Sequence, residues 1–263
     1  MQLPGGLVED GVRRRDWAFR PVSGALELAL AEIKEEAGCA PQAVTRALAL
    51  ALGRLGGAQA SEERVAALCV ADRQYLMREL ERHLGSQGGW FQADCPACGS
   101  RFDFHLDYAD LPVQEAGAGY PQAQVDMDGR QWRFRLPNGA DQEAVAGLPD
   151  GEALAGLFRR LALDPDLPEA PGQDLIAAAE AALEAVSPAV CLSVQAACPD
   201  CGSGNTVELE PYRALARPAD HLLEEVHRIA LAYHWAEADI FELPRARRQR
   251  YLQLIDRARG MAE

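Results

Sequence analysis

Four of the seven cysteines in this chain have a spacing that could do chemistry, because they form two matching turns. The turns are Cys95-Pro-Ala-Cys98-Gly99 and Cys198-Pro-Asp-Cys201-Gly202. Each places two thiols three positions apart and follows them with a glycine, which tolerates positive φ. Two such turns supply the sulfur ligands of a closed tetrahedral zinc site. We therefore expect Cys95, Cys98, Cys198 and Cys201 to bind one structural zinc ion.

The similarity between the two turns extends beyond the cysteines. At an offset of 103 residues, Gln92-Ala93 matches Gln195-Ala196 and Ser100 matches Ser203. Apolar and polar residues alternate after each turn, as in a half-buried strand, so each turn is expected at the tip of a hairpin. The pattern predicts two halves of one zinc ribbon over residues 88–118 and 189–212. An ion bridging them would close a loop of 99 residues and fix where the intervening segment leaves and re-enters.

Two other interpretations of the cysteine turns stay open. One is a thioredoxin-like redox pair, but the βαβ surroundings that this requires are missing. The other is a pair of unrelated free-thiol turns. The remaining Cys39, Cys69 and Cys191 lie in apolar or helical surroundings, where cysteine behaves as a small hydrophobe. Seven cysteines used in this way suit a reducing compartment.

Composition and charge limit the classes of function. The chain has 263 residues and a net charge of −14, with 6 basic and 16 acidic side chains in residues 99–197. An acidic middle repels phosphates, so nucleic-acid binding is not expected of the whole protein. The sequence contains no apolar run of membrane-spanning length and no signal-peptide pattern. We expect a cytoplasmic protein, with incorporation into an assembled particle left open.

Periodicity predicts an α+β fold that is mainly α-helical, with helical units at both ends. A hairpin around Asp10-Gly11 forms an N-terminal arm over residues 1–20. Helices over about residues 24–37, 41–55, after Ser61 and 73–84 make a helical unit over 21–87, with Ser23, Ser61 and Asp72 as N-caps. An acidic α/β insertion occupies 119–188, with a hairpin at Asp128-Gly129 and helices over 139–147, 150–163 and 173–186. Residues 164–172 form its turn-rich connector, and a C-terminal helical unit covers 213–263.

The arginine runs and the histidines each allow a functional and a structural interpretation. Arg13-Arg14-Arg15 could contact phosphate, but we favour a charged edge strand. Arg245 to Arg250 could form a nucleic-acid patch, but acidic residues just upstream favour a contact within the chain or with a partner protein. The five histidines are scattered and are expected at the surface or in packing. No phosphate loop or catalytic set stands out, so we expect no enzymatic activity.

Several short segments carry a resemblance. They are Leu3-Pro4-Gly5-Gly6, Arg20 to Gly24, Asp72 to Leu76, Arg135 to Asp141 and Tyr233-His234-Trp235 with the arginine-rich final helix. With the paired cysteine turns, they resemble the T-even-like phage baseplate family and its counterparts in phage-tail-like contractile injection systems. The resemblance implies a non-enzymatic structural or assembly protein of a baseplate or hub. Its partners would be other baseplate, hub, spike or tube proteins, and the four cysteines transfer as metal ligands.

Two alternatives accompany this leading hypothesis. The first is a zinc-ribbon adaptor that binds nucleic acid or a nucleic-acid-processing enzyme, which salt-sensitive binding would favour. The second is a metallohydrolase, which would need an open coordination position that four thiolates deny. Neither a membrane nor a small-molecule substrate is expected.

Overall fold

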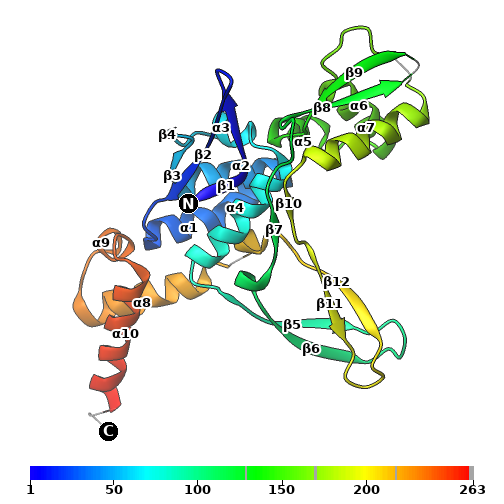
Figure 1. Cartoon of the computed structure of the whole chain (residues 1–263). Helices are drawn as coiled ribbons and strands as arrows, with labels where there is room; N and C mark the ends of the chain where they lie inside the picture. The colour runs from blue at the N-terminus through cyan, green and yellow to red at the C-terminus, as the bar shows by residue number, and fades with distance from the viewer. Residues whose placement is uncertain (128, 169–170, 217, 261–263) are drawn as a thin grey trace.

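The computed structural model describes residues 1–127, 129–168, 171–216 and 218–260. It is a mixed α/β protein with sheets of two to four strands, drawn out into several lobes (Figure 1). The expectation of a mainly α-helical α+β fold with helical units at both ends is wrong, because the chain begins with two strands and only its C-terminal end is helical. Strands at the N-terminus were predicted, but as a separate arm. They instead belong to the body of the protein.

The body combines an antiparallel sheet with four helices. The sheet has the order β1 (Gln2–Glu9), β2 (Val12–Phe19), β3 (Leu52–Leu55) and β4 (Ala58–Gln59). The helices are α1 (Gly24–Glu36), α2 (Ala40–Ala51), α3 (Glu62–Ala66) and α4 (Val70–His83). Leu3, Leu7 and Trp17 from the first two strands are buried in the same core as Leu48 of α2 and Leu80 of α4. One continuous core therefore joins residues that the sequence divided between an arm and a helical unit.

Helix starts in the body follow local capping chemistry. Ser23 accepts a hydrogen bond from the Leu26 N–H, and Ser61 accepts one from the Arg64 N–H, each at 3.3 Å. Both caps were predicted, since a serine oxygen satisfies a backbone donor that the first turn leaves free. The predicted end of the second helix is wrong. α2 ends at Ala51, and the next four residues leave the helix to pair with β2 as strand β3.

The predicted cap at Asp72 is also wrong, and the reason is a long-range contact. α4 begins at Val70, so Asp72 lies inside its first turn. The buried carboxylate accepts hydrogen bonds from the backbone N–H groups of Gly5 at 2.7 Å and Gly6 at 2.6 Å. Asp72 therefore attaches β1 to α4 instead of capping the helix.

The Arg13-Arg14-Arg15 run lies on a stretch of β2 that is paired on one side. β1 pairs with this stretch, whereas β3 pairs with β2 only at Trp17–Phe19, so the favoured interpretation of a charged strand edge holds for these arginines. Arg13 donates to the carbonyl oxygen of Pro4, and Arg15 donates to that of Leu3, both at 2.6 Å. Arg15 also pairs with Glu115 at 2.7 Å. These two arginines brace β1 and its surroundings within the chain.

After the body, the chain forms two hairpins that flank the insertion. The first consists of β5 (Gly88–Asp94) and β6 (Arg101–Asp107), and the second of β11 (Ser193–Ala197) and β12 (Gly204–Glu208). The short η1 (Tyr108–Asp110) follows β6. Strands β7 (Val113–Gln114) and β10 (Ala189–Val190) then pair with each other, at the two points where the insertion leaves and re-enters. This pairing is a second closure of the insertion, besides the one expected from the cysteine turns.

The insertion has its own small core. It contains the hairpin β8 (Gln122–Met127) and β9 (Arg130–Arg135), followed by α5 (Gly139–Val145), α6 (Asp150–Leu161) and α7 (Gln173–Val186). The hairpin and the three helices were predicted. Asp128 of the predicted turn and residues 169–170 of the predicted connector lie outside the described residues. Apolar side chains of the hairpin, α6 and α7 form the core: Val125, Trp132, Phe134, Phe158, Leu161, Leu175 and Ala179.

The C-terminal lobe is helical, and a buried arginine, Arg248, attaches it to the body. It follows η2 (Arg213–Ala216) and contains α8 (Asp220–Tyr233), α9 (Glu237–Phe241) and α10 (Arg245–Gly260). The guanidinium of Arg248 is fully buried and pairs with Glu27 of α1 at 2.7 Å and with Glu225 of α8 at 3.2 Å. The favoured interpretation of this arginine run as a contact within the chain is thus confirmed for Arg248. In the described part of the chain, no helix combines the length and apolar character needed to cross a bilayer.

Candidate metal centre

Both cysteine turns lie at hairpin tips, as the alternation predicted. In the first turn the Cys95 N–H donates to the Ser100 carbonyl at 2.9 Å, and the Gly99 N–H donates back to the Cys95 carbonyl at 2.8 Å. The second turn repeats these bonds between Cys198 and Ser203 and between Gly202 and Cys198, both at 2.9 Å. Gly99 and Gly202 have φ values of 75° and 72°, in the left-handed region that glycine adopts without strain. The two turns are therefore the same local structure twice.

The two hairpins bring the four sulfur atoms together. All four lie within 4.8 Å of one another, although Cys98 and Cys198 are 100 positions apart in sequence. The Cys95 and Cys201 sulfurs are 3.7 Å apart, and those of Cys98 and Cys198 are 3.8 Å apart. Sulfurs bound to one zinc ion at about 2.3 Å in a tetrahedron are separated by about 3.8 Å. These four cysteines, here named the four-cysteine cluster, can hold a metal ion.

A small apolar core lies beneath the four-cysteine cluster. Cys95 and Cys198, the first cysteines of each turn, are buried with Phe102 and Ala196, whereas Cys98 and Cys201 are exposed. Two of the four buried residues of this core are thus candidate ligands themselves. So small a core supplies little hydrophobic stabilisation. Much of what holds the two hairpins together must come from the cysteines and what they bind.

Asn205 is a supporting residue that the sequence analysis did not single out. Its buried amide nitrogen donates to the carbonyl oxygens of Ser203 at 2.9 Å and Ala196 at 3.3 Å, which ties the second turn to its hairpin. At the offset of 103 residues, Asn205 occupies the place of Phe102. Because Phe and Asn are chemically different, the offset gives no signal for a shared role at this position. Only the structure shows that one packs the core while the other braces the turn.

Hydrogen bonds at the turns lower the pKa of two of the thiols, Cys95 and Cys98. The hydroxyl and backbone N–H of Ser100 lower the pKa of Cys98 to about 6. The Cys98 backbone N–H is the main group that lowers the pKa of Cys95. The Ser203 backbone N–H also lowers the pKa of Cys201, but hydrogen bonds with the other thiols, led by Cys98, outweigh it and raise that pKa to about 12. Four sulfurs this close can all be thiolates only with a cation between them.

The arrangement decides which chemistry the four-cysteine cluster can perform. Four cysteine ligands around one ion leave no position for a water or a substrate, which is the arrangement of structural metal sites. The redox alternative is not supported, since both turns join antiparallel strands and do not precede a helix in a βαβ unit. Cys39, Cys69 and Cys191 do not join this cluster. It is also the only group of potential metal ligands found among the described residues.

The chain matches no protein-family model, and no curated protein or solved structure is significantly similar to it.

Proposed function

We propose that this protein is a structural or assembly component of a contractile, phage-tail-like particle, and that it acts through contacts with other proteins. Its four-cysteine cluster binds one zinc ion that joins the two hairpins. The observation that carries the proposal is the closed set of four sulfurs, contributed by hairpins on either side of an insertion. A metal held in this way organises a scaffold and leaves no position for catalysis.

Three of the segments that resemble the baseplate family, Leu3–Gly6, Asp72–Leu76 and Arg135–Asp141, contact one another in turn at the junction of the body and the insertion. Gly5 and Gly6 of the N-terminal segment donate to Asp72. Arg73, which follows it, is 1% exposed and lies so close to Gly139 of the Arg135–Asp141 segment that a Cβ there would come within 2.2 Å of the guanidinium. Segments 66 or 67 positions apart in sequence are thus packed against one another. Because these segments hold parts of the chain together, they favour a structural role over a catalytic one.

Zinc is the metal proposed on the chemistry of the donor set. Four thiolates suit a soft or borderline ion, and among common biological metals a tetrahedral set of four sulfurs is typical of zinc or of an iron–sulfur site. The sulfur separations of 3.7 and 3.8 Å fit ligands of a single zinc ion. The turns place the thiols at two hairpin tips, in the arrangement of zinc ribbons.

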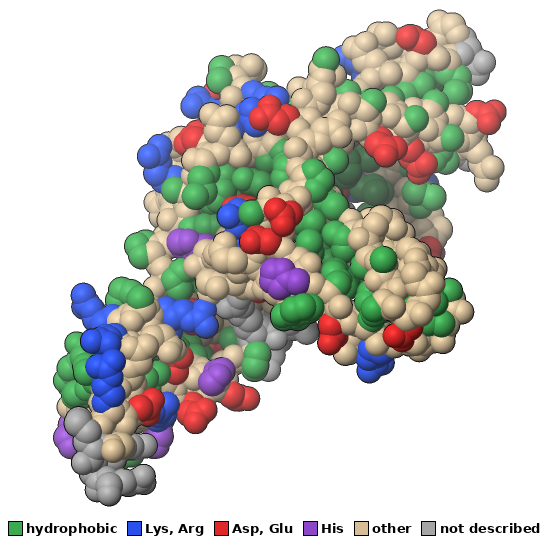
Figure 2. Space-filling view, turned by 60° about the horizontal axis from the view of Figure 1, so that its bottom comes forward, with side chains coloured by type: hydrophobic (Ala, Val, Ile, Leu, Met, Phe, Trp, Pro, Cys, Tyr) green, Lys and Arg blue, Asp and Glu red, His purple; other side chains and the backbone are tan. Residues whose placement is uncertain are grey.

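The alternative of a nucleic-acid adaptor is less well supported. The strands and turns of the two hairpins carry one arginine, Arg101, against five acidic residues: Asp94, Asp103, Asp107, Asp200 and Glu208. Basic side chains gather instead along the C-terminal lobe, where Arg248 is used internally (Figure 2). A binder of single- or double-stranded nucleic acid needs a basic surface that follows the phosphates. Binding to mixed-sequence DNA or RNA that weakens steeply with salt would favour this alternative.

The function can be tested in a cell that produces contractile particles. A tagged copy of the chain should recover baseplate, hub, spike or tube proteins, and analysis of purified particles should show whether it remains in them. The Cys98→Ser variant is expected to lose these partners together with its metal if the hairpins form part of the contact. Recovery of none of these proteins, from cells shown to make particles, would contradict the proposal.

A further inference from the structure

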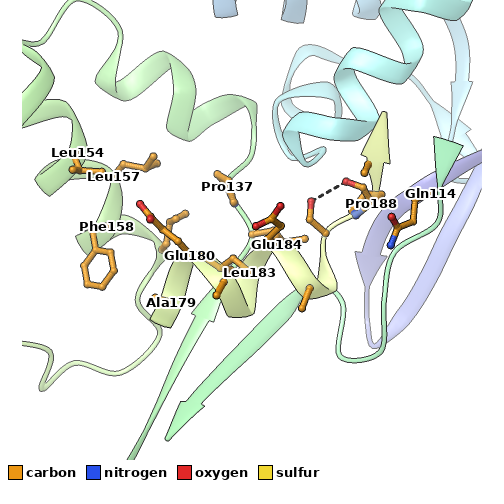
Figure 3. A pocket seen from close by; sticks show the side chains of 16 residues that line it. Gln114, Pro137, Leu154, Leu157, Phe158, Ala179, Glu180, Leu183, Glu184 and Pro188 are labelled. Atoms are coloured by element: carbon orange, nitrogen blue, oxygen red, sulfur yellow. Dashed lines mark hydrogen bonds between the residues drawn. The ribbon is translucent and has the colours of Figure 1, made fainter. Parts of the chain in front are cut away.

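An open groove of about 750 Å³ lies between the insertion and its junction with the body. It is lined on one side by Leu154, Leu157 and Phe158 of α6 and on another by Ala179 and Leu183 of α7 (Figure 3). Pro137, Pro188 and Gln114 line the end that faces the body. Its volume is within the range of ligand-binding cavities, and most of its lining is apolar.

The apolar stripe of α6 continues past the core that it serves. Leu154, Leu157, Phe158 and Leu161 are spaced i, i+3, i+4 and i+7, which places them on one face of the helix. Phe158 and Leu161 are buried in the core of the insertion, but Leu154 is 50% exposed at the groove. Packing of the insertion's own core does not require a leucine at position 154, because half of this side chain is exposed. The exposed end of the stripe therefore offers a surface to something outside the insertion.

Charge at the groove favours one kind of occupant. Glu180 and Glu184 are one helical turn apart on α7, and in Figure 3 both side chains rise toward the side where Leu157 and Pro137 lie. Among the described residues that line the groove, these two are acidic and none is basic. The insertion as a whole, residues 119–188, has 12 acidic and 5 basic side chains. An acidic rim repels anionic lipid headgroups and attracts lysine or arginine.

The dimensions of the groove indicate a short helix. Seven positions separate Leu154 from Leu161, so the stripe runs for about 10 Å, or two helical turns. A partner helix could place apolar side chains at i, i+3 or i+4, and i+7 in it. A second copy of this chain fits poorly. Its α10 exposes Arg247, Arg250 and only one large apolar residue, Leu254, and the two exposed leucines of α8, Leu223 and Leu231, are eight positions apart with His227 between them.

We propose that this groove binds an amphipathic helix of another protein, with two turns of apolar side chains against Leu154, Leu157 and Leu183 and a basic residue beside Glu180 and Glu184. The inference rests on the proposed function in one respect, namely that the protein works through contacts with other proteins. It goes beyond it by naming the surface and the chemistry of the partner segment.

The probe is a random library of displayed 16-residue linear peptides, selected against the full-length protein. The selected sequences should share the apolar i, i+3 or i+4, i+7 pattern with a lysine or arginine next to it. Leu154→Glu should weaken their binding by at least about tenfold, because it places a charge against the apolar face of the peptide. Leu231→Glu is the matched control: Leu231 is 59% exposed on α8, outside the groove, and binding should not change.

A charge exchange tests the acidic rim. Glu184→Lys should weaken the selected basic peptides by about fivefold, and replacing their basic residue with glutamate should restore binding to this variant. Circular dichroism and thermal unfolding establish that each variant is folded. Three results would overturn the inference: no peptide that competes for the groove, selected peptides without the pattern, or equal binding to Leu154→Glu. Self-association abolished by Leu154→Glu would also overturn it, in favour of a second copy.

The groove and the proposed function can fail independently. A protein that is recovered with particle components but whose groove binds no helix would overturn only this inference. Peptides that bind as described, with no association with particle proteins, would leave the groove in place and overturn the proposed function.

Discussion

Removal of the metal from the four-cysteine cluster should loosen the two hairpins and leave the insertion attached to the body. The two-stranded pair β7–β10 already closes the chain at the base of the insertion, through Val113 and Val190. A metal bridging Cys98 and Cys198 therefore closes a smaller loop, of 15 positions from Cys98 to Val113 and 8 from Val190 to Cys198, 23 in all. The ion need not close the whole stretch of 99 residues by itself.

The size of the effect follows from that loop. A cross-link across about 23 residues removes roughly 3.4 kcal/mol of conformational freedom from the open state at 25 °C. The hairpins have little else to hold them together, because isolated two-stranded hairpins are marginal in water and their shared core is small. The free energy of local opening should thus fall by at least about 3.4 kcal/mol when the metal is lost, which corresponds to about 300-fold faster amide exchange.

Hydrogen exchange on the intact chain is the assay, with and without a chelator and in the Cys98→Ser variant. Amides of β5, β6, β11 and β12 should exchange faster, whereas those of β8, β9 and α7 should not. Cys39→Ser is the matched control, since Cys39 lies at the N-cap of α2, where serine is at least as favourable, and its thiol is not in the cluster. Unchanged exchange in the hairpins, or an equal increase in the insertion, would refute this reasoning.

Two further predictions concern buried charges. Arg248→Met should cost about 3–5 kcal/mol of unfolding free energy in urea, because Glu27 and Glu225 would both lose the buried cation that they share, although Glu225 keeps a bond from Gln249; a cost below about 1 kcal/mol would contradict the buried pairing. In the insertion, burial raises the pKa of Asp141, but bonds from Arg135, the Asn138 N–H and Arg160 outweigh it and hold that pKa below its usual value. Its stabilisation is therefore present above about pH 4 and is lost as the pH falls. Asp141→Asn should lower the melting temperature at pH 7 and have a smaller effect at pH 3; an equal effect at both would contradict this.

Local signals in the sequence predicted much of the fold. Ser23 and Ser61 are caps whose hydrogen bonds reach only three residues along the chain, and sequence suffices for these. The two cysteine turns are equally local, so their place at hairpin tips could be predicted. That the two turns meet followed from chemistry, since a four-sulfur site needs both.

Long-range contacts account for the errors. The apolar run at the end of α2 predicts a helix through Leu55. Leu52–Leu55 instead form a strand, because they pair with the backbone of β2. Asp72 was predicted as a cap because aspartate side chains often accept hydrogen bonds from backbone N–H groups at helix starts. Its carboxylate oxygens instead accept from Gly5 and Gly6, which lie 67 and 66 positions earlier in the chain. The first two strands look separate from the helices until Leu3 and Trp17 are seen in the common core. In each case a partner distant in sequence outweighed a local preference.

The central claim is that the four sulfurs hold one zinc ion. Elemental analysis combined with X-ray absorption spectroscopy, on protein purified without chelator, tests it most directly. We expect one zinc per chain with four sulfur neighbours at about 2.3 Å, and loss of that ion in the Cys98→Ser variant. A metal content near zero, or a zinc shell containing nitrogen or oxygen, would contradict the account.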